Sequence, residues 1–128
     1  MYLLDTSVLI GDEQGRLPAG IPTDGEAAIS VVTLAELHLG VLAATTDDVR
    51  RTRLRTLLQA QDFDPIPVTA EIAEHFAGLV VAARNAGRKL RPLDTLIAAT
   101  AAANDLVLLT QDSDFDGLPV RVQVLGQR

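Results

Sequence analysis

Residues 1–11 read MYLLDTSVLIG and place the carboxylate of Asp5 inside an apolar run. Residues 2–5 predict a short buried strand, and a helix is predicted to begin at residues 5–7. A charge in such a position is costly unless it caps a helix, pairs with another group or holds a cation. A helix cap is the simplest explanation, because Asp is among the best N-cap residues. Other acids in similar positions would point to a site instead.

Strands and helices are predicted to alternate along the chain. Further strands are expected at residues 27–30 and 106–110, an extended segment at 64–68 and an edge strand at 120–125. Helices are expected to begin at Thr33, Thr46, Thr69 and Pro92, and residues 11–25 are expected to form a loop. This alternation predicts an α/β fold, an α/β/α sandwich with a central parallel sheet, in one domain that covers residues 1–128.

The composition excludes several kinds of site. The chain has no cysteine, which rules out disulfides, thiolate metal sites and a thiol nucleophile. It shows no signal-peptide pattern and no apolar run long enough to span a membrane, so we expect a soluble, cytoplasmic protein. The formal net charge of −6 at pH 7 is unfavourable for binding nucleic acid through phosphates. Such binding requires the acids to be concentrated in a site and the bases to lie elsewhere.

Four further acids lie near predicted element ends, and each has an ordinary structural explanation. Glu36 follows Thr33 by three residues, as in a capping box. Asp94 falls in the first turn of a helix, where the helix dipole favours negative charge. Asp112 and Asp114 follow the strand at 106–110, and Asp is common in turns.

Taken together, the acids indicate a metal site. Asp5 and Asp112 follow predicted strands, and Glu36 and Asp94 lie in first turns of predicted helices. In a parallel sheet these positions face the crevice in which ligands bind. Converging carboxylates repel one another, and a hard divalent cation such as Mg²⁺ or Mn²⁺ removes that conflict. The reaction that fits such a site is metal-assisted phosphodiester hydrolysis.

Four stretches of the chain resemble the PIN-domain ribonucleases, most closely the VapC-type toxins of bacterial toxin–antitoxin pairs. They are LDTSVLI (4–10), SVVTLAEL (30–37), LDTLIAATA (93–101) and LTQDSDF (109–115), in the family's order. The resemblance implies a Mg²⁺- or Mn²⁺-dependent endoribonuclease that cleaves transfer or ribosomal RNA and inhibits translation. It also implies a cognate VapB-type antitoxin that neutralises the toxin, and a homodimer.

The resemblance also assigns roles position by position. The family's four catalytic and metal-binding acids correspond to Asp5, Glu36, Asp94 and Asp112. Asp114 is a neighbouring acid; we favour Asp112 as the direct ligand, and both assignments stay open, as does the number of metal ions. Supporting hydroxyls are expected from Thr6, Ser7 and Thr110.

Basic residues gather in two segments. One spans residues 50–55, where a solvated helix face is an equally good explanation. The other leads into the helix of Asp94 and is the better candidate for contacting the RNA backbone; it consists of Arg84, Arg88, Lys89 and Arg91. For the antitoxin, we expect docking on the exposed faces of helices between residues 33 and 61. Leu37, Val41 and Leu42 are candidate contacts, although core packing is the better explanation for most of them.

Two alternatives remain open from the sequence. One is an α/β phosphohydrolase that uses Asp5 as a covalent nucleophile, although the second Asp typical of haloacid dehalogenases is missing two positions further on. The other is a non-catalytic RNA- or protein-binding module of the same fold. That module would be expected if one of the acids were replaced, and all of them are present.

Overall fold

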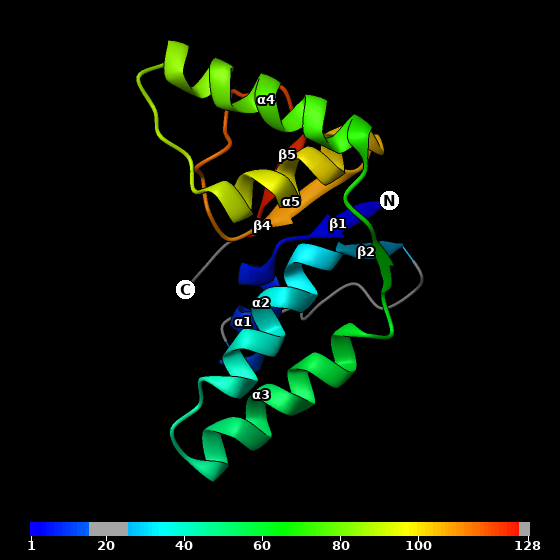
Figure 1. The fold of residues 1–128 in the computed structure, drawn as a ribbon, viewed down its shortest axis with the longest axis vertical. Coiled ribbons are helices and arrows are strands. Elements are labelled where there is room, and N and C mark those ends of the chain that lie inside the picture. The colour runs from blue at the N-terminus through cyan, green and yellow to red at the C-terminus, as the bar shows by residue number, and fades with distance from the viewer. Residues whose placement is uncertain (16–25, 126–128) are drawn as a thin grey trace.

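A computed structural model describes residues 1–15 and 26–125. Its central sheet has five parallel strands in the order β3-β2-β1-β4-β5. The strands are β1 (Tyr2–Leu4), β2 (Ala27–Ser30), β3 (Asp64–Ile66), β4 (Val107–Thr110) and β5 (Val122–Val124). The helices are α1 (Thr6–Glu13), α2 (Val31–Leu42), α3 (Asp47–Ala60), α4 (Ala70–Asn85) and α5 (Pro92–Ala103). Figure 1 shows their arrangement.

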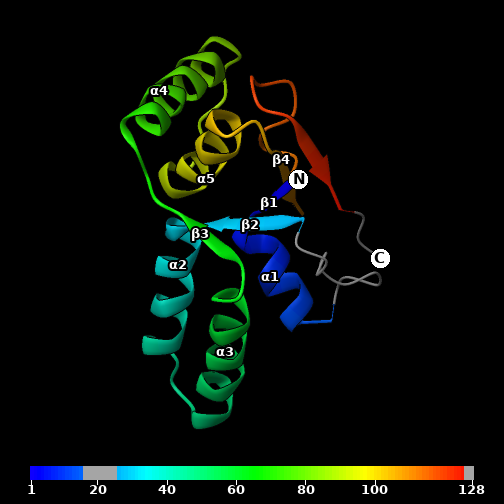
Figure 2. The ribbon, with the colours of Figure 1, turned by 90° about the vertical axis from the view of Figure 1, so that its right-hand side faces the viewer.

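Helices cover both faces of the sheet. In Figure 2, α4 and α5 lie on one side of the sheet, and α1, α2 and α3 lie on the other. This arrangement confirms the predicted α/β/α sandwich with a parallel sheet. No helix in the described part of the chain combines the length and apolar character needed to cross a bilayer.

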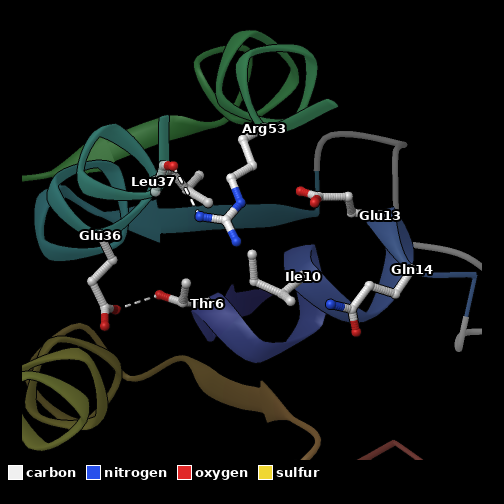
Figure 3. Close-up of a pocket in the computed structure, with 8 residues that line it drawn as sticks. Thr6, Ile10, Glu13, Gln14, Glu36, Leu37 and Arg53 are labelled. Atoms are coloured by element: carbon white, nitrogen blue, oxygen red, sulfur yellow. Dashed lines mark hydrogen bonds between the residues drawn. The ribbon is translucent and has the colours of Figure 1, made fainter. Parts of the chain in front are cut away.

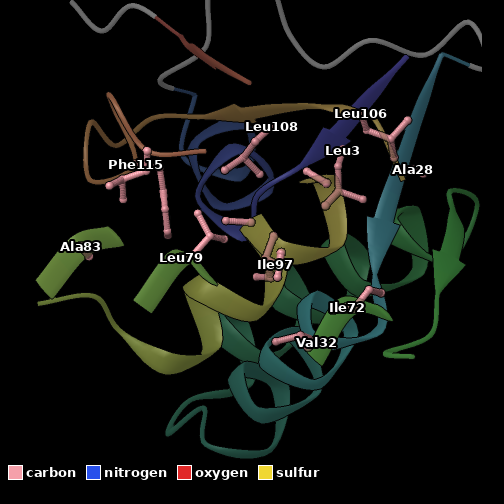
Figure 4. Close-up of a cluster of buried hydrophobic side chains, with 14 residues drawn as sticks. Leu3, Ala28, Val32, Ile72, Leu79, Ala83, Ile97, Leu106, Leu108 and Phe115 are labelled. Atoms are coloured by element: carbon pink, nitrogen blue, oxygen red, sulfur yellow. The ribbon is translucent and has the colours of Figure 1, made fainter. Parts of the chain in front are cut away.

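Alternation along the strands divides the core between the two faces. Leu3 of β1 and Leu108 of β4 pack with α4 and α5, in the cluster shown in Figure 4. The next residues along these strands, Leu4 and Leu109, belong to the second cluster with α1, α2 and α3. Successive strand residues point to opposite faces, so a strand buried on both sides is apolar at every position. This explains why residues 106–109, which include most of β4, are all apolar.

The strand order places a potential ligand-binding crevice between β1 and β4. From β1 the chain passes to β2 and β3 on one side and then returns to β4 on the other side of β1. The strand order therefore reverses between β1 and β4, and ligands bind at the carboxyl ends of strands at such a point. Asp5 follows β1 there, and its N–H donates to the carbonyl of Leu109 in β4 at 2.9 Å.

Some predicted element boundaries differ from the structure; the edge strand expected at 120–125, for example, covers only Val122–Val124. Helix α1 continues to Glu13, so the first residues of the predicted 11–25 loop are helical; residues 16–25 lie outside the described residues. Helix α2 begins at Val31 and not at Thr33, because the Ser30 hydroxyl accepts from the N–H of Val32 at 3.0 Å and caps the helix. Thr33 is fully buried inside the helix.

Candidate active site

Asp5 is buried and held by two neighbouring hydroxyls, one from α1 and one from the end of β4. Its side chain is 6% exposed, and its Oδ2 accepts from Ser7 Oγ and from Thr110 Oγ1, each at 2.8 Å. The same hydroxyl oxygens accept backbone N–H groups: Ser7 that of Gln111 and Thr110 that of Asp112, both at 3.1 Å. Asp5 occupies the N-cap position of α1 without making a side-chain cap bond. Its Oδ1 takes no hydrogen bond from the described residues.

Glu36 is connected to α1 and does not cap its own helix. Thr6 Oγ1 donates to Glu36 Oε1 at 2.7 Å and lies 3.0 Å from the hydroxyl of the buried Thr33. The capping-box explanation of Glu36 is therefore wrong, since the helix starts two residues earlier, at Val31. The three polar groups instead join α1 to α2 at the edge of the sheet where Asp5 lies.

Asp94 is electrostatically coupled to the other acids. It lies in the first turn of α5. Burial, followed by the negative charges of Asp5 and Glu36, raises the pKa of Asp94 to about 6. Arg91 lowers this pKa, and Asp112 makes a smaller contribution that raises it. The charges that act on Asp94 thus come from three different elements, and the fold brings the four predicted acids within electrostatic range of one another.

Asp112 and Asp114 lie on the exposed turn that follows β4. Burial raises the pKa of the Asp112 carboxyl, and the charges of Asp5 and Asp114 raise it further, whereas Arg91 lowers it. Asp112 therefore interacts with both Asp5 and Asp94, while Asp114 acts on Asp112 from the same turn.

Arg88 fastens this turn to the end of α4. Its guanidinium donates through Nη1 to the carbonyl of Asp116 at 2.7 Å and through Nη2 to the carbonyl of Asp114. The backbone of Arg88 is itself fixed: Gly87 has a positive φ of 70°, and the Arg88 N–H donates to the carbonyl of Ala83 at 2.8 Å. These contacts form a Schellman motif, for which glycine is the favoured residue.

The other predicted basic residues differ in their surroundings. Arg91 precedes α5 and acts on both Asp94 and Asp112, so it lies beside the acids. Arg84 and Lys89 are exposed, and no hydrogen bond or ion pair ties their side chains to the described residues. The RNA contacts predicted for these basic residues stay a prediction, and the Arg88 guanidinium is already engaged by carbonyls.

The acids provide the type of ligand atom that a hard divalent cation prefers. They offer only carboxylate oxygens, the ligands that Mg²⁺ and Mn²⁺ prefer. Oδ1 of Asp5 takes no hydrogen bond from the described residues. The pKa values of Asp94 and Asp112 are raised by burial and then by neighbouring negative charge, and a cation would relieve the repulsion. Among residues 1–15 and 26–125, however, no three Asp, Glu or His side chains are close enough as they stand to share an ion. Their role as metal ligands therefore stays a prediction.

A pocket adjoins these acids on the side of α1, α2 and α3. Its volume is about 200 Å³, and it shares Thr6 and Glu36 with the acid site. Figure 3 shows the Arg53 guanidinium reaching into it from α3, with Glu36 to one side and Glu13 to the other. No sequence pattern indicates this pocket, since residues 50–55 form one basic run with nothing to distinguish Arg53.

Comparisons with known proteins agree with the fold. The PIN domain family model matches residues 2–120. The chain is 44% identical to Ribonuclease VapC5 of Mycobacterium tuberculosis over 116 residues, which cover 91% of this chain and 86% of the relative. It is 41% identical to Ribonuclease VapC4 of the same species over 117 residues, covering 91% and 90%.

A solved structure shows the same architecture. The crystal structure of VapBC-5, a member of the VapBC family of toxin-antitoxin systems from Mycobacterium tuberculosis, superposes with a TM-score of 0.78 at 40% identity. The match covers 97% of this chain and 96% of that chain. With a family model that spans nearly the whole chain and relatives above 40% identity, this chain belongs to the PIN domain family.

Proposed function

We propose that this chain is a metal-dependent endoribonuclease toxin, active in the cytoplasm and neutralised by a cognate VapB-type antitoxin. The observation that carries the proposal is the position of Asp5, Glu36, Asp94 and Asp112 at one edge of the sheet. They lie there in a chain that is 44% identical to a ribonuclease. Residues 1–128 act in this proposal as one nuclease domain, with transfer or ribosomal RNA as substrate.

The four acids would hold the divalent ion, Mg²⁺ or Mn²⁺, with Asp112 favoured over Asp114 as the ligand from the turn after β4. When bound, such an ion polarises the phosphodiester and lowers the pKa of a water molecule. Asp5 is prepared for this role because Ser7 and Thr110 fix its Oδ2 and leave Oδ1 to a ligand.

Other groups orient the acids and the substrate. Thr6 holds one oxygen of Glu36 by its hydroxyl. Arg88 fixes the turn that carries Asp112 through two backbone carbonyls. Arg84, Lys89 and Arg91 precede or flank α5 and provide positive charge for the RNA phosphates beside an otherwise acidic site.

The antitoxin proposal is supported by exposed apolar side chains on α2 and α3. Leu39 and Leu42 of α2 are 65% and 83% exposed, and Leu54 and Leu58 of α3 are 42% and 56% exposed. Large exposed apolar side chains are candidates for protein contacts, and we assign these four leucines to the antitoxin. Leu37 is 4% exposed and belongs to the core, as the core-packing alternative predicts, so it is not a contact for the antitoxin. A homodimer remains part of the proposal.

The direct test is RNA cleavage by the purified chain in Mg²⁺, in Mn²⁺ and in EDTA. We expect cleavage with either metal, none with EDTA, and inhibition when the antitoxin is added. Asp5→Asn keeps an oxygen acceptor for Ser7 and Thr110, so it should fold and yet lose cleavage. Asp48→Asn is the matched control, because Asp48 only pairs with Arg51 on the exposed surface of α3. Full cleavage in EDTA would overturn the metal dependence.

The same experiment separates the two alternatives. A phosphohydrolase that uses Asp5 as a nucleophile would form a phosphoryl-enzyme, detectable by mass spectrometry after acid quenching. A non-catalytic module would bind RNA and leave it intact in every buffer. We expect neither outcome.

A further inference from the structure

The pocket beside Glu36 has a lining suited to one polar, planar group. Arg53 and Gln14 provide hydrogen-bond donors, Glu13 and Glu36 provide carboxylate acceptors, and Ile10 lies beneath the guanidinium (Figure 3). Because Thr6 and Glu36 line both the pocket and the acid site, a group in this pocket lies next to the reacting phosphodiester.

Arg53 is distinguished from the other arginines of α3 by its contacts. Arg50 and Arg51 pair with Asp47 and Asp48 in the first turn of their own helix, at 2.9 and 3.0 Å. Arg53 is half-buried and donates through Nη1 to the carbonyl of Gly40 in α2 at 2.9 Å. A guanidinium has five N–H donors in a rigid fork, so the one bond to Gly40 positions the group and leaves further donors for a ligand.

The charges of the pocket favour a base over a phosphate. One guanidinium faces the two carboxylates of Glu13 and Glu36, so the lining carries an excess of negative charge that repels an anion. Glu13 is itself held in place, because Thr56 Oγ1 donates to its Oε2 at 2.6 Å. A neutral base with acceptors on one edge and N–H donors on the other complements such a lining.

Guanine has this pattern among the four RNA bases. Its O6 and N7 accept a pair of hydrogen bonds from an arginine, which is the commonest specific contact to this base. Its Watson–Crick edge carries N–H donors for a carboxylate, and proteins read such edges in unpaired RNA. We infer that this pocket is a specificity subsite that holds an unpaired guanine next to the cleaved phosphodiester, recognised by Arg53. The inference rests on the proposed ribonuclease function.

The test uses a random-sequence, single-stranded RNA pool, cleaved in Mg²⁺ and sequenced at the new ends. The wild-type chain should enrich guanine at one position next to the cut. Arg53→Gln should reduce this enrichment about fivefold or more, since a bidentate arginine pair gives discrimination of that order, while cleavage of the pool continues. Arg53→Lys should also reduce it, because lysine lacks the fork. Arg55→Gln, an exposed site on the same helix, should leave the enrichment unchanged.

The outcomes separate this inference from the proposed function. If folded Arg53→Gln still enriches guanine, the subsite is overturned and the ribonuclease function is not. If Arg53→Gln does not fold, Arg53→Lys gives the same test. The subsite is also overturned if the wild type selects no base, or a base other than guanine. It is overturned as well if Arg53→Gln only weakens antitoxin binding, because that result would assign the pocket to the antitoxin. A wild-type chain that cleaves no RNA in either metal overturns the ribonuclease function and the subsite with it.

Discussion

The hydroxyl of Thr110 donates to Oδ2 of Asp5 at 2.8 Å and links the carboxyl ends of β4 and β1. Both residues are buried, and the Thr110 oxygen also accepts from the N–H of Asp112. One side chain thus fixes the Asp5 carboxylate and the start of the turn that carries Asp112.

Replacing this hydroxyl should affect stability and activity together. Thr110→Val keeps the shape of the side chain and removes the donor to a buried carboxylate, which should cost about 2 kcal/mol of unfolding free energy. Urea denaturation measures the loss, and RNA cleavage at equal folded fraction should fall as well. Thr110→Ser keeps the hydroxyl and is the control; equal stability of the valine variant and the wild type would contradict the role of the bond.

Stability without metal should depend on pH through Asp94. The pKa of Asp94 is raised from 3.8 to about 6 in the folded state, so the folded protein binds more protons than the unfolded chain between these values. The free energy of unfolding therefore falls as pH rises from about 4 to about 6, and the raised pKa has no such effect below that window.

Thermal unfolding in EDTA across this range measures the effect. Asp94→Asn removes the titrating group, so its unfolding temperature should fall less steeply than that of the wild type. Asp105→Asn is a control, because Asp105 pairs with Arg121 on the surface. Parallel pH curves for Asp94→Asn and the wild type would count against the coupling of the acids.

Arg88 should act by holding the turn after β4. Arg88→Gln removes the fork that binds the carbonyls of Asp114 and Asp116, so amide hydrogen exchange in residues 112–116 should become faster, without RNA present. RNA cleavage should decrease. Arg84→Gln, four residues earlier on the exposed end of α4, should leave this exchange unchanged.

Salt dependence distinguishes this role from a phosphate contact. If Arg88 bound the RNA backbone, Arg88→Gln would reduce the slope of log binding constant against log salt by about one. We expect that slope to stay constant in Arg88→Gln and to fall in Lys89→Gln. A slope that falls in Arg88→Gln and stays constant in Lys89→Gln would instead support the RNA-backbone contact that the sequence predicts for Arg88.

The exposed leucines of α2 and α3 should bind the antitoxin. Leu42 is 83% exposed, so Leu42→Asp should fold normally, cleave RNA at the wild-type rate and resist inhibition by the antitoxin. Inhibition curves with increasing antitoxin measure the change, for which we expect about tenfold or more. Val81→Asp on α4, which is 52% exposed, is the control on another face. Unchanged inhibition of Leu42→Asp would place the antitoxin elsewhere.

Much of the fold follows from local sequence. The starts of α3 and α4 are predicted correctly because Thr46 and Thr69 accept from the N–H groups three residues on. The start of α2 is missed because Ser30 and Thr33 both look like caps, and only packing shows that Thr33 is buried. The end of α1 is missed because Gly11 signals a loop. In the structure Gly11 lies against the Gln111 side chain, and an added Cβ would lie 2.4 Å from Gln111 Oε1, so the amide of Gln111 would have to shift.

The acids of the site and the three hydroxyls that hold them, from Thr6, Ser7 and Thr110, could be predicted from sequence, but the roles of Arg88 and Arg53 could not. Asp5, Asp94 and Asp112 stand at element ends, a position that sequence patterns reveal, whereas Glu36 lies in the second turn of α2 and not in the predicted first turn. Arg88 and Arg53 act through contacts with residues far along the chain, at Asp116 and Gly40, and such pairings depend on tertiary packing. A basic run in the sequence does not tell which of its members turns toward a site.

The central claim is that the acids at the carboxyl end of the sheet together bind a divalent ion. Calorimetric titration of Mn²⁺ into the metal-free wild type and Asp94→Asn, both checked for folding, tests it without reference to RNA. We predict saturable binding to the wild type, weakened about tenfold or more in Asp94→Asn, since a carboxylate ligand is lost. Equal Mn²⁺ affinity of the two proteins, or no binding to the wild type, would contradict the account.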